Sequence, residues 1–158
     1  MKLIDQQLLD YLSGQADSLE RKRKNLNFHF GDEDVLQRML NAFEPGTYVR
    51  PHKHENPEKR EVFILLRGRL MMLFFDNEGN VSHCQLLDHK AGKYAVEIAP
   101  GEWHMAISLE RGTVVYEVKD GPYNPSNDKQ FASWAPAEGT PDANVWLERL
   151  IGEFVIDL

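Results

Sequence analysis

The chain has 158 residues, of which 42% are hydrophobic and 27% are charged, and its formal net charge is −7. These values are typical of a globular protein of one domain, long enough to bury a hydrophobic core. The acidic balance argues against nucleic-acid binding, because phosphate neutralisation needs a basic surface. Residues 21–24 form the one basic cluster, and they are interpreted as a solvated junction between a helix and a strand. The alternatives are a patch that binds phosphate, or a cluster at the mouth of the barrel that holds an anionic ligand.

Cys84 is the only cysteine, so an internal disulfide is excluded. Together with the lack of an apolar N-terminal leader, this predicts a cytoplasmic protein. No apolar run is long enough to cross a membrane, so no membrane partner is expected. Cys84 lies in an alternating stretch without a Cys–His pairing signal, which favours a half-buried filler over a nucleophile.

Residues 1–44 predict a helix followed by two strands. Residues 4–18 carry a helical apolar stripe after Asp5, a suitable N-cap, and the stripe is expected to pack on a sheet. Residues 25–30 alternate between polar and apolar, the period of a strand, and His29 is interpreted as a hydrogen-bonded lining residue more than a metal ligand. Residues 35–44 form a second strand-like run.

Several further short strands follow. Residues 62–75 are apolar almost throughout and are interrupted at Gly68, which predicts two strands with a bend, buried on both faces. Residues 81–88, 105–109 and 113–119 are expected to be strands joined by turns. In the last of these, Glu117 and Lys119 share one face and either line a pocket or form an exposed charge pair.

The C-terminal part is predicted to form a loop followed by a helix. Residues 121–139 are loop-like, and Thr140 and Pro141 form a helix start, with a cap followed by proline at the first helical position. The apolar face of this helix either packs on its own barrel or contributes to a dimer contact.

A candidate metal site is spread over two segments. His52 and His54 stand at i and i+2, so on a strand both side chains point to the same side. A charged turn with Asn-Pro follows and would return Glu61 beside them, while Glu55, the alternative carboxylate, faces the opposite way. A Pro-Gly turn precedes His104, which opens another strand. Three imidazoles and a carboxylate without a thiolate suit one divalent metal, Fe, Ni, Mn, Cu or Zn, with positions left open.

The spacing of these residues resembles known motifs. Gly46, His52, His54, Glu61 and Gly68 resemble the first cupin motif, with a longer gap between histidine and glutamate than is usual. The segment from Pro100 to His104 resembles the second motif, with Ser108 where many cupins carry asparagine.

More closely, the chain resembles the WbuC family of cupin-fold metalloproteins, within the RmlC-like cupin superfamily. The resemblance rests on residues 38–40, 44–54, 66–70, 117–123 and 134–136 and covers most of the chain up to Gly139. It implies an all-β cupin fold, a double-stranded β-helix or jelly-roll barrel, with an N-terminal and a C-terminal helix. We expect one domain over residues 1–158, with the barrel at about 25–120 and the loop and helix at 121–158. A homodimer is expected from the habits of this fold.

The first functional hypothesis is a metal-dependent enzyme, an oxygenase, isomerase or lyase, acting on a small polar or anionic molecule. Arg38, Arg50 or Lys119 would hold an anionic group, with Tyr48 and His29 as further pocket residues. The association of the WbuC family with surface-polysaccharide gene clusters suggests a sugar-derived substrate. One alternative is a non-catalytic binder of a small molecule or metal. Another is a metal-free sugar-nucleotide epimerase, which needs a His–Asp base and a tyrosine acid.

Overall fold

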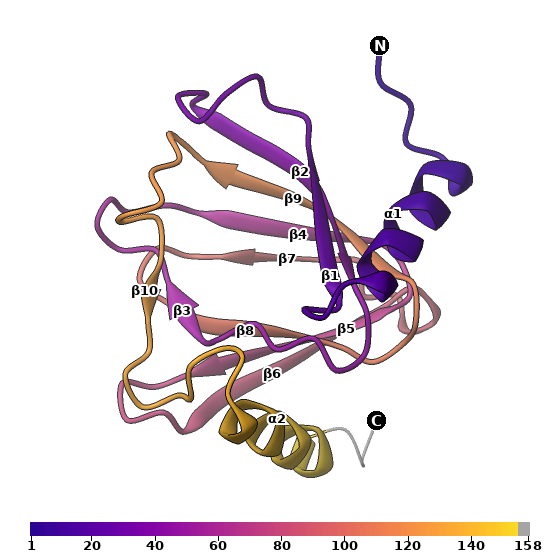
Figure 1. Ribbon diagram of the computed structural model, residues 1–158. Coiled ribbons are helices and arrows are strands. Elements are labelled where there is room, and N and C mark those ends of the chain that lie inside the picture. The colour runs from indigo at the N-terminus through magenta and orange to yellow at the C-terminus, as the bar shows by residue number, and fades with distance from the viewer. Residues whose placement is uncertain (155–158) are drawn as a thin grey trace.

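The computed structural model describes residues 1–154 and consists of two five-stranded antiparallel sheets with two outer helices. One sheet has the order β1-β2-β9-β4-β7 and the other the order β10-β3-β8-β5-β6. Figure 1 shows the first sheet above the second. The strands are β1 (Arg23–Asn27), β2 (Leu36–Phe43), β3 (His52–Lys53), β4 (Glu61–Arg67), β5 (Arg69–Phe75), β6 (Val81–Asp88), β7 (Ala95–Ile98), β8 (Trp103–Ser108), β9 (Thr113–Asp120) and β10 (Gln130–Phe131). The predicted jelly-roll fold with terminal helices is confirmed.

Helix α1 (Gln6–Ser18) covers the outer face of the first sheet. Asp5 caps it as predicted, since the Asp5 carboxylate accepts a hydrogen bond from the Leu8 amide at 3.0 Å. The apolar stripe of α1, including Leu12 and Ala16, packs against Leu40 and neighbouring residues of β2 and β9. The helix therefore lies outside the barrel and leaves the space between the sheets free.

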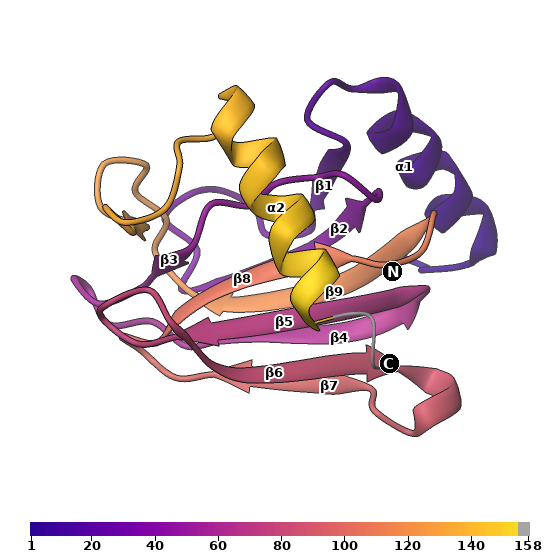
Figure 2. The ribbon, with the colours of Figure 1, turned by 90° about the horizontal axis from the view of Figure 1, so that it is seen from below.

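Helix α2 (Pro141–Phe154) covers the outer face of the second sheet, as Figure 2 shows from below. The Thr140 hydroxyl accepts a hydrogen bond from the Ala143 amide at 3.3 Å, which confirms the predicted helix start. Leu147 and Leu150 are buried against Met71 and other residues of β5 and β8. Of the two arrangements considered for this helix, the structure shows packing on its own barrel.

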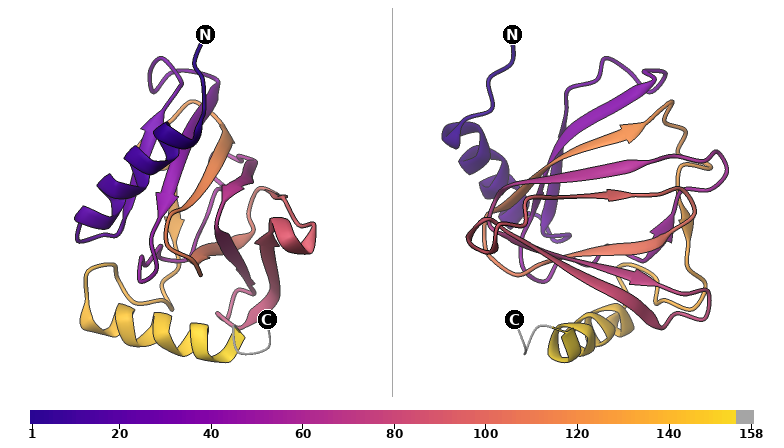
Figure 3. Two further views of the ribbon diagram at one scale, coloured as in Figure 1. Left: turned by 90° about the vertical axis from the view of Figure 1, so that its right-hand side faces the viewer. Right: turned by 180° about the vertical axis from the view of Figure 1, so that it is seen from behind.

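The two α-helices of residues 1–154 lie on different outer faces of the β-structure (Figure 3). Neither has the length and apolar character that crossing a bilayer requires.

Gly68 marks the point where the chain passes from the first sheet to the second. Its φ is +83°, and a Cβ there would lie 2.7 Å from the Cα of Thr113, so the bend requires glycine. Strand β5 is buried on both faces, because Met72 faces the other sheet and Met71 faces α2. The same expectation is wrong for β4, where Ile64 on the outer face stays 38% exposed.

Three element boundaries differ from the sequence-based expectation. Strand β1 ends at Asn27, so His29 lies in the connection to β2. Strand β3 has only two residues, so His54 follows the strand instead of continuing it. Strand β8 begins at Trp103, which places His104 inside the strand.

Candidate metal centre

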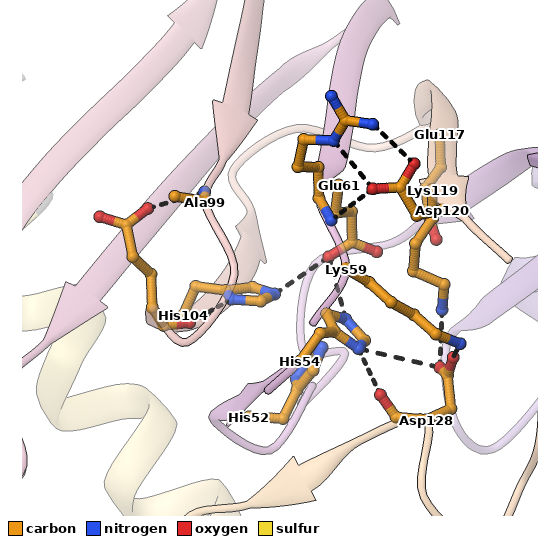
Figure 4. A network of polar contacts seen from close by, with 12 residues as sticks. His52, His54, Lys59, Glu61, Ala99, His104, Glu117, Lys119, Asp120 and Asp128 are labelled. Carbon is orange, nitrogen blue, oxygen red and sulfur yellow. Dashed lines mark hydrogen bonds and ion pairs between the residues drawn. The ribbon is translucent and has the colours of Figure 1, made fainter. Parts of the chain in front are cut away.

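The four predicted metal ligands come together between the sheets. His52, His54, Glu61 and His104 each offer one donor atom, and these atoms all lie within 4.8 Å of one another. Each of the four side chains is at most 4% exposed. Figure 4 shows the glutamate carboxylate directed toward the histidine rings.

Strand register explains this convergence. His52 is the direct partner of His104 across β3 and β8, in the second sheet. Glu61 is the first residue of β4, in the first sheet, and the charged turn before it reverses the chain. Glu61 Oε2 lies 3.0 Å from His104 Nε2 and 3.4 Å from His54 Nε2. His52 and His104 thus come from the second sheet, His54 from the segment after β3, and the carboxylate from the first sheet.

The outer nitrogen of each histidine contacts a backbone carbonyl. His52 Nδ1 lies 3.0 Å from the Arg50 oxygen, and His104 Nδ1 lies 2.9 Å from the Glu102 oxygen. His54 Nδ1 contacts the Asp128 oxygen. A carbonyl only accepts hydrogen bonds, so the proton of each neutral ring belongs on Nδ1, and Nε2 keeps its lone pair. Metal-bound histidines are oriented by the same kind of outer contact.

The charges of the site favour an ionised Glu61. Burial raises the pKa of Glu61, but hydrogen bonds from His104 Nε2 and His54 Nε2, when these nitrogens carry a proton, outweigh burial and hold that pKa well below its ordinary value. In the tautomers that the backbone carbonyls favour, a cation has to take the place of that proton. Burial also lowers the pKa of His52 well below its ordinary value, which keeps the ring neutral. The pKa of Glu117 is shifted in the opposite direction, because burial and the nearby Glu61 both raise it. Its carboxylate accepts a hydrogen bond from Asn41.

This donor set fits a metal ion. Within residues 1–154, His54 Nε2 is buried and makes no hydrogen bond. The lone pair of His104 Nε2 faces the Glu61 Oε2 atom at 3.0 Å. Because both atoms are then hydrogen-bond acceptors, they repel each other unless a cation lies between them. Neighbouring ligands at about 2.1 Å from a metal lie roughly 3.0–3.4 Å apart, in agreement with the two measured separations. The buried His/Glu group can therefore hold a divalent metal.

Asp128 joins this site to the loop after β9. Its carboxylate accepts hydrogen bonds from Lys59 Nζ and Lys119 Nζ, each at 2.7 Å, and all three side chains are buried. Figure 4 shows this group of charges beside His54. Sequence reasoning did not single out Asp128 or Lys59, because no local pattern connects residues so far apart in the chain.

The position of Lys119, left open by the sequence, is inward. The other face of β9, with Val114 and Tyr116, packs with α1, so the buried face with Glu117 and Lys119 looks into the barrel. Both residues line a cavity of about 810 Å³ that opens beside the metal ligands. This volume is in the usual range for small-molecule sites.

Of the five predicted pocket residues, His29, Arg50 and Lys119 line this cavity. The expectation for Arg38 is corrected, since its side chain alternates outward and its guanidinium lies 3.5 Å from Asp34. His29 is a hydrogen-bonded lining residue, accepting from the Arg38 amide at 3.1 Å.

Tyr48 is also corrected, because it belongs to the core beneath α2. It is 5% exposed, its hydroxyl donates to the Pro136 oxygen at 2.9 Å, and its ring packs edge-on against Trp146. Burial raises the pKa of Tyr48 to about 12.

The remaining histidines and the basic cluster have other roles. His83 and His89 are exposed, as the sequence suggested. Arg21 and Arg23 of the basic cluster line the mouth of the cavity, and both pair with Glu138.

Comparison with known proteins identifies a family and a fold. Residues 4–87, more than half of the chain, match the family model described as a domain of unknown function, DUF6016. No curated protein gave a significant match.

Solved structures with a similar fold include CapF in complex with the inhibitor 3-isopropenyl-tropolone, at 20% identity and a TM-score of 0.58 over 72% of this chain and 32% of that one. The capsular polysaccharide assembling protein CapF from Staphylococcus aureus is 22% identical, with a TM-score of 0.55 over 68% of this chain and 28% of that one. A cupin superfamily protein from Desulfitobacterium hafniense DCB-2 is 14% identical, with a TM-score of 0.52 over 69% of this chain and 86% of that one.

These identities bear on the fold alone, and the chain spans less than a third of either CapF chain. The two-sheet architecture and the likeness to cupin structures agree with each other. The chain belongs to the DUF6016 family and has the jelly-roll fold of its cupin-superfamily neighbours.

Proposed function

We propose that this protein is a metal-dependent cupin enzyme that binds one divalent transition metal through His52, His54, Glu61 and His104. The observation that carries the proposal is the arrangement of the three buried rings, each with its outer nitrogen on a backbone carbonyl and its inner donor beside an ionised carboxylate. Such a set is typical of metal sites that keep positions open for substrate.

The bound metal would supply a Lewis acid or, in the case of Fe(II), a centre for O₂ chemistry. The side chains that line the cavity determine which ligands can bind beside the metal. The cavity of about 810 Å³ admits a small polar molecule beside the ligands. Burial and the nearby Glu61 raise the pKa of Glu117, whose carboxyl group lies in the cavity wall. Lys119 contributes a positive charge that Asp128 holds in place.

The test is elemental analysis of the purified protein beside the double variant His52→Ala/His54→Ala. A matched control is His83→Ala/His89→Ala, which removes two exposed histidines and the same number of imidazoles. We expect close to one metal ion per chain in the wild type and the control, and loss of the metal in the ligand variant. Absence of metal from all three proteins after reconstitution would contradict the proposal and leave a metal-free pocket, as in an epimerase.

The identity of the metal then directs the search for a reaction. Turnover that needs Fe(II) and O₂ would indicate an oxygenase, and turnover with Zn or Mn without O₂ would indicate an isomerase or lyase. A tightly bound small molecule that stays unchanged after long incubation would favour a non-catalytic binding protein.

We also propose, as finer statements, membership of the WbuC family, a sugar-derived substrate and a homodimer. The resemblance of residues 44–54 and 117–123 to that family supports the first two. The presence of a capsular polysaccharide assembling protein among the fold neighbours is compatible with a role in surface-polysaccharide biosynthesis. Size-exclusion chromatography with light scattering tests the homodimer directly.

A further inference from the structure

The positive side chains that line the cavity fall into two groups. Arg21 and Arg23 are paired with Glu138, and Lys119 is paired with Asp128. Within residues 1–154, Arg50 and Lys129 line the same cavity and have no ion pair. Lys24 also lines the cavity and, like Lys129, is exposed, but Lys24 lies on β1, whereas Lys129 directly precedes β10, the strand that pairs with β3 at His52. Two cations beside the metal ligands are therefore left without a carboxylate.

The guanidinium group of Arg50 is held in a fixed position by its contacts. One of its terminal nitrogens, Nη2, donates to the Ala132 oxygen at 2.6 Å, and the guanidinium lies 5.7 Å from the centre of the Phe131 ring. Its Nε is buried and makes no hydrogen bond within residues 1–154. A guanidinium anchored in this way, with donors left over, is preorganised for two-point contact with a planar oxyanion.

Lys129 approaches from the neighbouring segment. Phe131 is the direct partner of His52 across β10 and β3, and Lys129 precedes Phe131 by two residues and lines the cavity with it. Lys129 therefore shares the wall of this cavity with the candidate metal ligands His52, Glu61 and His104.

Charge balance favours an anionic ligand in a filled site. Glu61 is the carboxylate among the four candidate ligands, and a bound dication would more than compensate it. Arg50 and Lys129 would then face the cavity uncompensated, a costly state once a ligand excludes water. A neutral ligand would leave this cost in place, whereas an oxyanion would remove it.

We propose that Arg50 and Lys129 form a binding subsite for an oxyanion group, carboxylate or phosphate, of a small molecule whose other end reaches the metal centre. This inference rests on the proposed metal-dependent function. The volume of the cavity leaves room for both ends of such a ligand.

Calorimetric titration with malonate and with inorganic phosphate, on zinc-loaded and on chelator-treated protein, tests the subsite. We expect one of the two anions to bind the wild type in both metal states, and the preferred anion identifies the group. Arg50→Gln and Lys129→Gln should each lower the association constant about tenfold or more, because each removes a charge-assisted contact. Lys90→Gln, which changes the charge equally on an exposed residue, should bind like the wild type.

Two measurements separate this inference from the metal centre. Elemental analysis of Arg50→Gln and Lys129→Gln should show unchanged metal content, since neither residue is a ligand. Partial recovery of anion affinity in Arg50→Lys would support a role for the cation and exclude misfolding as the cause of the loss. Failure of both anions to bind the chelator-treated wild type would overturn the subsite even if metal binds. Equal affinity in wild type, Arg50→Gln and Lys129→Gln would overturn it as well.

Discussion

Asp128 forms ion pairs with two buried lysines. Replacing Asp128 with Asn therefore tests how much these ion pairs stabilise the region around the candidate metal ligands. The carboxylate lies 2.7 Å from both Lys59 Nζ and Lys119 Nζ, and the three side chains are at most 4% exposed. Removing one partner from a buried ion pair costs about 3–5 kcal/mol, because the other charge is left uncompensated. Lys59 keeps the Pro122 oxygen at 2.5 Å as an acceptor, which favours the lower end of that range.

We therefore expect Asp128→Asn to lower the free energy of unfolding by about 3 kcal/mol, or the melting temperature by roughly 6–12 °C for a chain of this size. Burial raises the pKa of Asp128, but Lys119 and Lys59 outweigh it and lower that pKa below its ordinary value. The stabilising contribution is thus present above about pH 3.9 and is lost as the pH falls through the lower folded value. A denaturant titration at pH 7 measures it in full.

The matched control is Asp120→Asn, which removes the same charge from the pair between Asp120 and Arg60. That pair is largely exposed, with Arg60 at 65%, so we expect a loss of about 1 kcal/mol or less. A second check is Lys59→Met in the Asp128→Asn background, which removes one stranded ammonium and should restore part of the stability. Equal losses in Asp128→Asn and Asp120→Asn would refute the reasoning from burial.

Three further predictions follow from the fold and the site. Gly68→Ala should destabilise the protein by more than 1 kcal/mol in denaturant titration, because of its positive φ and the approach to Thr113, whereas Gly14→Ala on the open side of α1 should stabilise it by about 0.5–1 kcal/mol. Tyr48→Phe should cost about 1 kcal/mol through its lost hydrogen bond, and spectroscopic titration should place the ionisation of this tyrosine near pH 12. Adding Zn²⁺ to chelator-treated protein should raise the melting temperature of the wild type but have little effect on His104→Ala, since metal stabilises only the state that binds it.

Patterns of period two predicted most of the strands, and they also explain one wrong candidate. Arg38 is a pocket candidate by its charge alone, since it shares a face with Leu40, which α1 covers. The alternation alone would have placed Arg38 outside the barrel. The opposite error concerns Tyr48, a predicted pocket residue four positions before His52, a spacing that would put both side chains on one face of a continuous strand. Residues 47–51 are not in a strand, so the alternation does not apply to them.

The convergence of the four candidate ligands could be predicted because short motifs contain them, whereas the residues that hold them in place could not. The predicted alternation holds only for His52, because His54 lies beyond the two residues of β3. What turns its ring toward the centre is the Asp128 carbonyl, 74 residues further along the chain. The partners of Asp128 depend in turn on the register of β9 and on the loop that follows it. Such contacts are set by tertiary packing, and no periodicity in the sequence carries them.

The pairing of β3 with β10 brings the metal ligands and the proposed oxyanion subsite into one unit. The Ala132 amide donates to the Pro51 oxygen at 2.9 Å, while the Ala132 oxygen accepts from Arg50. Phe131 pairs with His52 in between. The separation between Arg50 and the metal ligands is therefore fixed by backbone hydrogen bonds and does not depend on the long side chain alone. A ligand that contacts both Arg50 and the candidate metal centre must match this separation. The pairing of β3 with β10 therefore determines the length of ligand that the cavity can bind at both points.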